Sequence, residues 1–159
     1  MRKIVCWGLS AGGYYGIRAA HTHARHFIAA IGQGAGTHHF FSRAWLEKAQ
    51  YHEYPWSLLP ALAGKFGYLS TEQLLNDAQH KWSLLLSGVL ETPSCRLLLV
   101  NGTRDGLMPI EDSGLLLEHG SPKEARFFTG LTHMGNPDAL GTIYSWLESV
   151  VGIWVPQSL

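Results

Sequence analysis

The stretch 3-KIVCWGLSAGGYYGIRAA-20 decides the fold, because it joins a short apolar run to a helical pattern through a glycine-bounded serine. After its first lysine, the run 3–7 is continuously apolar, which is typical of a strand buried on both faces of a parallel sheet. A helical pattern over 12–23 follows at once. A turn this tight would raise the side chain of Ser10 above the end of the sheet.

Gly8 and Gly12 stand two residues before and two residues after Ser10, in the pattern G-x-S-x-G. Between a strand and a helix, this pattern is typical of a nucleophilic serine on a strained turn. We expect glycine at both positions because a side chain there would collide with the neighbouring strand or helix. The backbone N–H of Ala11 would then point toward an oxyanion formed beside the serine. A glycine-rich turn without catalytic chemistry is the plainer alternative.

Outward from this turn, apolar runs alternate with helical patterns along the whole chain. The predicted strands are 3–7, 27–31, 96–100 and 125–128, and the predicted single helices are 12–23, 111–119 and 138–151. This alternation indicates an α/β fold, with a mostly parallel sheet of about four strands and helices on both faces. We predict one domain over 1–159, since this length suffices for a single hydrophobic core.

Residues 40–88 separate the second and third predicted strands and are too many for a plain crossover. Their pattern predicts about three helices, the third beginning at the capping box Ser70–Gln73. The segment is rich in aromatic residues and glycines, namely Phe40, Phe41, Trp45, Tyr51, Tyr54, Trp56, Phe66, Gly67 and Tyr68. We expect a helical cap inserted over a pocket; a bulky helical packing layer is the alternative.

The acid that would accompany Ser10 should follow a later strand, because the chain order in this kind of fold is serine, acid, histidine. Asp105 lies in the glycine-flanked loop after the third predicted strand, within reach of a histidine. Glu111 and Asp112 compete for this role. Their place at the start of the next helix suggests that they complement the helix dipole instead. We therefore predict Asp105 as the acid.

Nine histidines compete for the role of base, and their positions separate them. His133 lies in the loop after the last predicted strand, just before the helix that Pro137 opens. The others fall at helix ends or in a loop that could line the pocket: His119, then His21, His23 and His26, then His38 and His39 after 32–36. We predict that His133 takes the proton of Ser10 while Asp105 orients its ring.

No metal or cofactor is expected. Two histidine pairs, His21 with His23 and His38 with His39, have no carboxylate or cysteine at ligand spacing nearby. The two cysteines, Cys6 and Cys95, do not make a disulfide framework.

The longer run 7-WGLSAGGYYGIRAAHTH-23 is more specific than the five-residue pattern. It resembles the nucleophile turn of fungal α/β-hydrolases that shorten polyketides in pigment and melanin biosynthesis, the yellowish-green heptaketide hydrolase type. The likeness continues through the loops of Asp105 and His133. It implies a triad of Ser10, Asp105 and His133. It also implies hydrolytic removal of an acyl group from an aromatic polyketide, a retro-Claisen cleavage in which a ring carbon leaves.

Members of that family carry a long N-terminal region, whereas this chain opens on the strand before Ser10. The resemblance therefore predicts the triad-bearing C-terminal portion of an N-terminally truncated hydrolase, with the second oxyanion donor outside the chain. The strand 3–7 would then form an unpaired edge of the sheet. A generic esterase or thioesterase, or an inactive fragment that only binds a ligand or partner, are the competing hypotheses.

The composition argues against several other kinds of partner. Charged residues make up 15% of the chain, the net charge is zero, and Lys and Arg are scattered, which disfavours nucleic acid and anionic membranes. The apolar N-terminal run is too short for a signal peptide, and no stretch is long enough to span a membrane. We expect a cytoplasmic protein whose partner is a small aromatic molecule. Nothing in the sequence indicates an oligomeric state.

Overall fold

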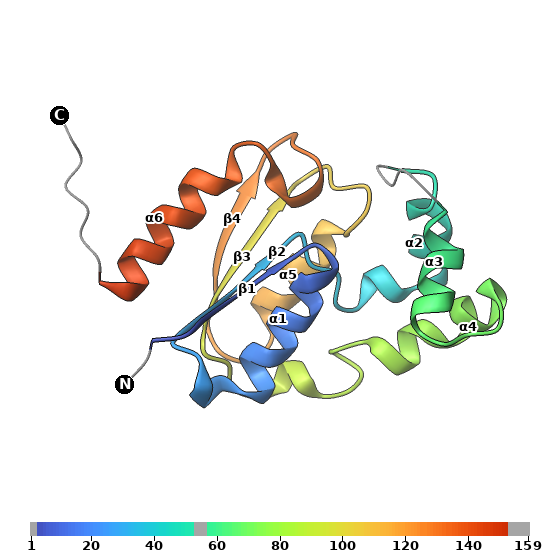
Figure 1. Cartoon of the computed structure of the whole chain (residues 1–159), viewed down its shortest axis with the longest axis horizontal. Helices are drawn as coiled ribbons and strands as arrows, with labels where there is room; N and C mark the ends of the chain where they lie inside the picture. The colour runs from blue at the N-terminus through green and yellow to red at the C-terminus, as the bar shows by residue number, and fades with distance from the viewer. Residues whose placement is uncertain (1–2, 53–56, 153–159) are drawn as a thin grey trace.

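Four strands form one parallel sheet in the computed structural model of the chain, which describes residues 3–52 and 57–152 (Figure 1). They are β1 (Val5–Leu9), β2 (Ala29–Gln33), β3 (Arg96–Gly102) and β4 (Glu124–Phe128), and their order in the sheet is their order in the chain. In the central register Trp7 lies opposite Ile31, which lies opposite Leu98. The prediction of a mostly parallel sheet of about four strands is confirmed.

The first three strands continue beyond their predicted ends. β1 begins two residues later than predicted and runs through Gly8 to Leu9, so that regular strand backbone reaches the residue before Ser10. β2 continues to Gln33, and β3 to Gly102. The predicted ends followed hydrophobicity, whereas parallel pairing depends on backbone groups that glycine and polar residues also supply.

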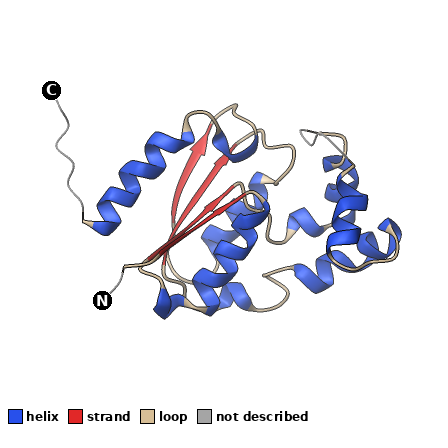
Figure 2. Ribbon diagram, in the orientation of Figure 1, coloured by secondary structure: helices blue, strands red, loops and turns tan. Residues whose placement is uncertain are grey.

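Helices cover both faces of the sheet (Figure 2). They are α1 (Ala11–Thr22) and α5 (Ile110–Glu118) on one face and α6 (Ala139–Val151) on the other. Successive side chains of a strand point to opposite faces, which divides the core in two. Ala30, Leu97 and Leu99 belong to the part of the core with α1 and α5. Ile31, Leu98 and Val100 belong to the part with α6.

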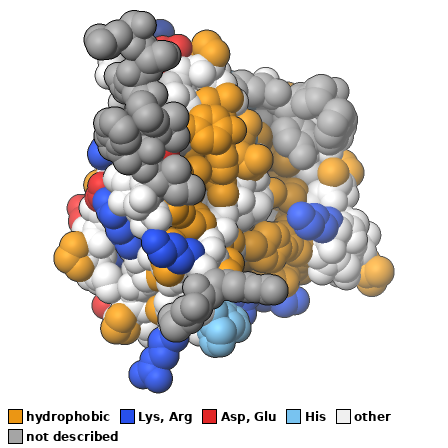
Figure 3. Space-filling model, turned by 60° about the vertical axis from the view of Figure 1, so that its left-hand side comes forward, with side chains coloured by type: hydrophobic (Ala, Val, Ile, Leu, Met, Phe, Trp, Pro, Cys, Tyr) orange, Lys and Arg blue, Asp and Glu red, His pale blue; other side chains and the backbone are white. Residues whose placement is uncertain are grey.

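The two edges of the sheet differ in character. Within the described residues β1 pairs only with β2. The side chains of Ile4, just before the strand, and of Leu9, its last residue, are 49% and 52% exposed. Hydrophobic side chains form a broad band on the side of the molecule shown in Figure 3. The β4 edge carries Glu124 and Arg126, charges that disfavour pairing with a further strand. In the described structure β1 therefore lies at an edge of the sheet, as the sequence predicts.

The segment 40–88 contains three α-helices, in number as predicted: α2 (Arg43–Ala49), α3 (Leu58–Lys65) and α4 (Thr71–Trp82). They gather beyond the carboxyl ends of the strands, on the opposite side of the molecule from α6 (Figure 1). Ser70 caps α4, since its hydroxyl accepts the N–H of Gln73 at 3.2 Å, while the Gln73 side chain accepts the N–H of Leu69 at 3.1 Å.

Short 3₁₀ turns complete the described structure, at Ala24–His26, His39–Phe41, Val89–Glu91 and His133–Gly135. None of the helices in the described ranges is both long and apolar enough to cross a lipid bilayer.

Candidate active site

Ser10 occupies a strained turn between β1 and α1. Its backbone has φ 53° and ψ −122°, a region that costs a non-glycine residue about 1–3 kcal/mol. Two hydrogen bonds hold the turn: the Ser10 N–H donates to the Gln33 carbonyl at 2.8 Å, and the Gly13 N–H donates to the Ser10 carbonyl at 2.8 Å. The serine therefore lies at the carboxyl end of the sheet and at the N-terminus of a helix.

Close packing around this turn requires glycine at Gly8 and Gly13, and not at Gly12. A Cβ on Gly8 would overlap the backbone carbonyl of Gly12, and a Cβ on Gly13 would come within 2.7 Å of the Ala35 Cβ. A Cβ on Gly12 would meet no atom within 4 Å. The expectation that a side chain at Gly12 would collide is therefore wrong, because that position faces open space and the tight contact falls one residue later.

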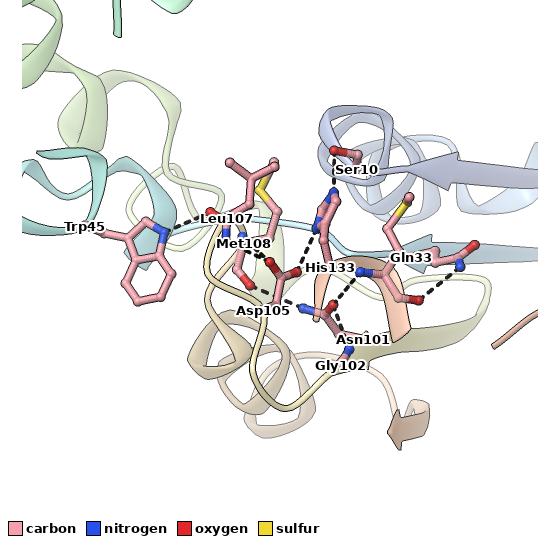
Figure 4. Close-up of polar contacts among 10 residues, drawn as sticks. Ser10, Gln33, Trp45, Asn101, Gly102, Asp105, Leu107, Met108 and His133 are labelled. Carbon is pink, nitrogen blue, oxygen red and sulfur yellow. Dashed lines mark hydrogen bonds and ion pairs between the residues drawn. The ribbon is translucent and has the colours of Figure 1, made fainter. Parts of the chain in front are cut away.

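His133 lies between Ser10 and Asp105 and forms a hydrogen bond with each (Figure 4). Its Nε2 is 2.8 Å from the Ser10 Oγ, and its Nδ1 is 2.8 Å from the Asp105 Oδ2. An ionised carboxylate only accepts, so Nδ1 carries the proton and Nε2 accepts from the serine hydroxyl. The three residues meet because the parallel strands β1, β3 and β4 end at the same edge of the sheet.

The backbone fixes the orientation of Asp105. Its side chain is fully buried, and its Oδ1 accepts the N–H groups of Leu107 and Met108, each at 2.8 Å. Together with the bond to His133, these contacts compensate the cost of burying a carboxylate. Because Oδ1 is held in this way, Oδ2 stays directed at the imidazole ring.

Two buried amides hold the residue that follows His133 (Figure 4). The Asn101 Oδ1 accepts the N–H of Met134 at 3.1 Å, and the Gln33 side-chain amide donates to the Met134 carbonyl at 3.1 Å. Met134 has φ 65°, which is uncommon for a non-glycine residue, so these bonds restrain the backbone that carries the imidazole. We did not predict either amide. The available signal was an amide at the end of a buried apolar run, directly after it for Asn101 and one glycine later for Gln33.

Asp112, the competing acid, accepts four hydrogen bonds. All four come from backbone N–H groups, and none comes from a histidine ring. It is fully buried, and its two carboxylate oxygens accept the N–H groups of Thr37, His38, His39 and Phe40 at 2.7–3.1 Å. The structural explanation from the helix dipole is thus incomplete, because the carboxylate also holds the loop after β2 in place.

Several competing histidines have contacts of their own away from Ser10. His119 follows the last residue of α5 and pairs with the Glu91 carboxylate at 2.8 Å. His21 donates from Nδ1 to the Thr92 carbonyl at 2.7 Å, and burial lowers its pKa, which favours the neutral ring. In the part of the chain that the structure describes, no three metal-ligating side chains converge on one point.

An apolar pocket opens beside Ser10, with walls from α1, α3 and the loops after β2 and β3. Its lining comprises Ser10, Ala11, Tyr14, Tyr15, Gly36, Phe40, Phe41, Leu58, Leu62, Lys65, Phe66, Leu107 and Met108. Burial raises the pKa of the Tyr14 hydroxyl, so this group stays neutral at physiological pH. Ala11 is the first residue of α1, where a backbone N–H has no partner within the helix.

The aromatic residues and the glycine expected in the cap fall into three groups: those that line the pocket, those outside its lining, and those outside the described residues. Phe40, Phe41 and Phe66 line it. Trp45 lies outside the lining and donates its indole N–H to the Leu107 carbonyl at 2.9 Å, and Tyr51 is 82% exposed. Tyr68 also lies outside the lining and donates to Asp77, and Gly67 turns with a positive φ after α3. Tyr54 and Trp56 fall outside the described residues. Of 32–36, only Gly36 reaches the pocket.

Comparison with solved structures shows that the chain has the α/β-hydrolase fold. The protein AbyA5 superposes with a TM-score of 0.73 at 20% identity, over 94% of this chain and 43% of AbyA5. An esterase from Pyrococcus furiosus superposes with a TM-score of 0.60 at 18% identity, over 96% of this chain and 54% of the esterase. A monoacylglycerol lipase from Paleococcus ferrophilus superposes with a TM-score of 0.61 at 18% identity, over 95% of this chain and 69% of the lipase.

The chain thus spans about half the length of the first two of these proteins. No family model matches the sequence, and no curated protein is similar to it in sequence.

Proposed function

We propose that this chain is the serine-bearing part of a hydrolase in which Ser10 is the nucleophile, His133 the general base and Asp105 the orienting acid. The observation that carries the proposal is the pair of 2.8 Å hydrogen bonds that join these side chains beside an apolar pocket. A nucleophile in contact with a base, which a third group orients, is the arrangement that nucleophilic catalysis requires.

The first half of the reaction transfers the acyl group to the protein. The Ser10 Oγ attacks the carbonyl carbon of the substrate, and its proton passes to Nε2 of His133. The resulting oxyanion accepts the backbone N–H of Ala11 at the positive end of α1. The intermediate then expels the leaving atom, which takes the proton from His133 and leaves an acyl ester on Ser10.

The second half restores the serine. Water gives a proton to His133 and attacks the acyl ester, and collapse of the second intermediate returns that proton to the Ser10 oxygen. The products are a carboxylic acid and the protonated leaving group. Throughout, Asp105 stabilises the charged imidazole without taking its proton.

For the substrate, we propose an aromatic polyketide that loses an acyl side chain, so that the leaving atom is a ring carbon. Two observations support this choice: the resemblance of the run 7–23 to polyketide-shortening hydrolases, and the aromatic side chains of the pocket. We further propose that 40–88 is the cap over this pocket, since α3 supplies one of its walls. A generic esterase is the second candidate, because Ser10, His133 and Asp105 could hydrolyse any acyl ester by the same steps.

Parallel assays of an acyl-naphthopyrone and of simple aryl esters test the proposal. We expect loss of the acyl group from the naphthopyrone, and no reaction with the Ser10→Ala variant. Turnover of aryl esters alone would favour the generic esterase. Absence of hydrolysis of both classes by the folded chain would show that the chain is an inactive fragment.

A further inference from the structure

Among the residues that the structure describes, one charged side chain lines the pocket beside Ser10, and the rest of that lining is neutral. Lys65, the last residue of α3, is exposed, and its Nζ lies 5.8 Å from the ring centres of both Tyr15 and Phe66. Both rings also line the pocket. The ammonium group is therefore placed at the wall of the cavity that would hold the acyl compound.

This ammonium group has no carboxylate partner in the part of the chain that the structure describes. The six ion pairs found there involve Arg43, Arg96, Arg126, His119 and His133, and none includes a lysine. A cation at the wall of an apolar cavity attracts an anion more strongly once a ligand displaces the water between them.

Stabilisation of a helix end by a cation is a role that Lys65 shares with Lys81, so this role alone does not explain why Lys65 lines the pocket. Lys81 occupies the last turn of α4, and its Nζ lies 5.2 Å and 5.4 Å from the rings of Tyr68 and Trp82. That environment is closely similar, yet neither Lys81 nor its two aromatic partners lines the Ser10 pocket. What distinguishes Lys65 is its place in the lining of the pocket that Ser10 also lines.

We infer that Lys65 makes the pocket selective for an acyl substrate that carries an anionic oxygen. The inference rests on the proposed function and specifies its substrate. Two kinds of group supply such an oxygen, a carboxylate on the acyl chain or an ionised phenol or enol on an aromatic ring. An aromatic polyketide carries the second kind close to the bond that would break.

Two pairs of substrates test the inference, each pair differing in charge and little in shape. The first is 4-nitrophenyl hydrogen adipate against 4-nitrophenyl hexanoate, and the second is 4-nitrophenyl 3-(3,5-dichloro-4-hydroxyphenyl)propanoate against its phenol methyl ether. The variant is Lys65→Met, which keeps most of the stem, and the matched control is Lys81→Met. Rates are followed as nitrophenolate release, at low salt and again at high salt.

We expect Lys65→Met to lower kcat/KM about tenfold for an anionic substrate and less than twofold for its neutral partner. High salt should reduce the selectivity of the wild-type chain, and Lys81→Met should leave it unchanged. The affected pair identifies the anion as a carboxylate or a phenolate.

Equal effects of Lys65→Met on charged and neutral substrates would overturn the inference. Hydrolysis of the neutral hexanoate that disappears in Ser10→Ala would still support the proposed function in that case. Absence of hydrolysis of every substrate by the folded wild-type chain would overturn both.

Discussion

The loops at the carboxyl ends of the strands and the helical segment 40–88 meet at one pocket, but different forces hold them. In the loops, directional hydrogen bonds position Ser10, His133 and Asp105, and the serine backbone is strained. The helical segment contributes apolar contacts, such as those of Leu62. Hydrogen bonds of this kind tolerate little displacement, whereas apolar packing tolerates substitutions that keep volume. We therefore expect the loops to govern the chemical step and the helices to govern which acyl compound is accepted.

A polar contact between the two regions bears on the site. The Trp45 indole of α2 donates to the Leu107 carbonyl at 2.9 Å, and the Leu107 N–H in turn donates to Asp105. The helical segment thus supports the loop that holds the acid. Variants on either side of this contact distinguish the two roles.

The largest effect should come from His133→Ala, which removes the proposed base. We expect kcat to fall by a factor on the order of 10⁶, toward the uncatalysed rate. His119→Ala is the matched control, since it removes only an exposed pair with Glu91 and should change kcat little. Initial rates with an aryl ester measure both, and similar losses would refute the choice of His133.

The two buried acids should respond to substitution in opposite ways. Asp105→Asn should lower kcat by a factor on the order of 10⁴ with little change in Tm, because the ring loses its orienting partner. Asp112→Asn should instead lower stability by about 2–4 kcal/mol, because an amide NH₂ would face backbone N–H groups. Thermal unfolding and turnover are measured on both variants. Full stability with lost turnover in Asp112→Asn would show that the wrong acid was chosen.

A smaller effect is expected from Asn101→Ala, which removes the hydrogen bond that the Asn101 side chain accepts from the Met134 N–H. We expect about a tenfold loss of kcat with KM unchanged, since small displacements of a catalytic group are costly. Asn76→Ala is the control, because that amide is exposed and its hydrogen bonds, to Arg43 and Glu72, lie away from the pocket lining. A change confined to KM would argue that Asn101 does not act through the imidazole.

The smallest effect should come from the helical segment. Leu62→Ala should raise KM a few-fold for bulky acyl esters and leave kcat nearly constant, because it removes apolar contact that substrate and transition state share. Leu86→Ala is the control, since Leu86 is 55% exposed and lies outside the pocket lining. A large drop in kcat from Leu62→Ala would break the division between chemistry and selection.

The same division explains what could be predicted from the sequence. The parallel sheet of about four strands, the helices on both faces and the meeting of Ser10, Asp105 and His133 follow from local patterns, because parallel strands end at one edge. The pocket lining depends on packing between distant segments, which no local pattern encodes. The roles of Asn101 and Gln33 likewise depend on the course of the loop at Met134, so the sequence did not predict them.

Covalent labelling of Ser10 tests the central claim most directly, because it reports the nucleophile without requiring turnover. The folded chain is treated with an alkyl fluorophosphonate, and intact mass and peptide mapping locate the adduct. We predict a single adduct on Ser10, absent in Ser10→Ala and formed far more slowly in His133→Ala. An adduct on another serine, such as Ser42, or none on the folded chain, would contradict the account.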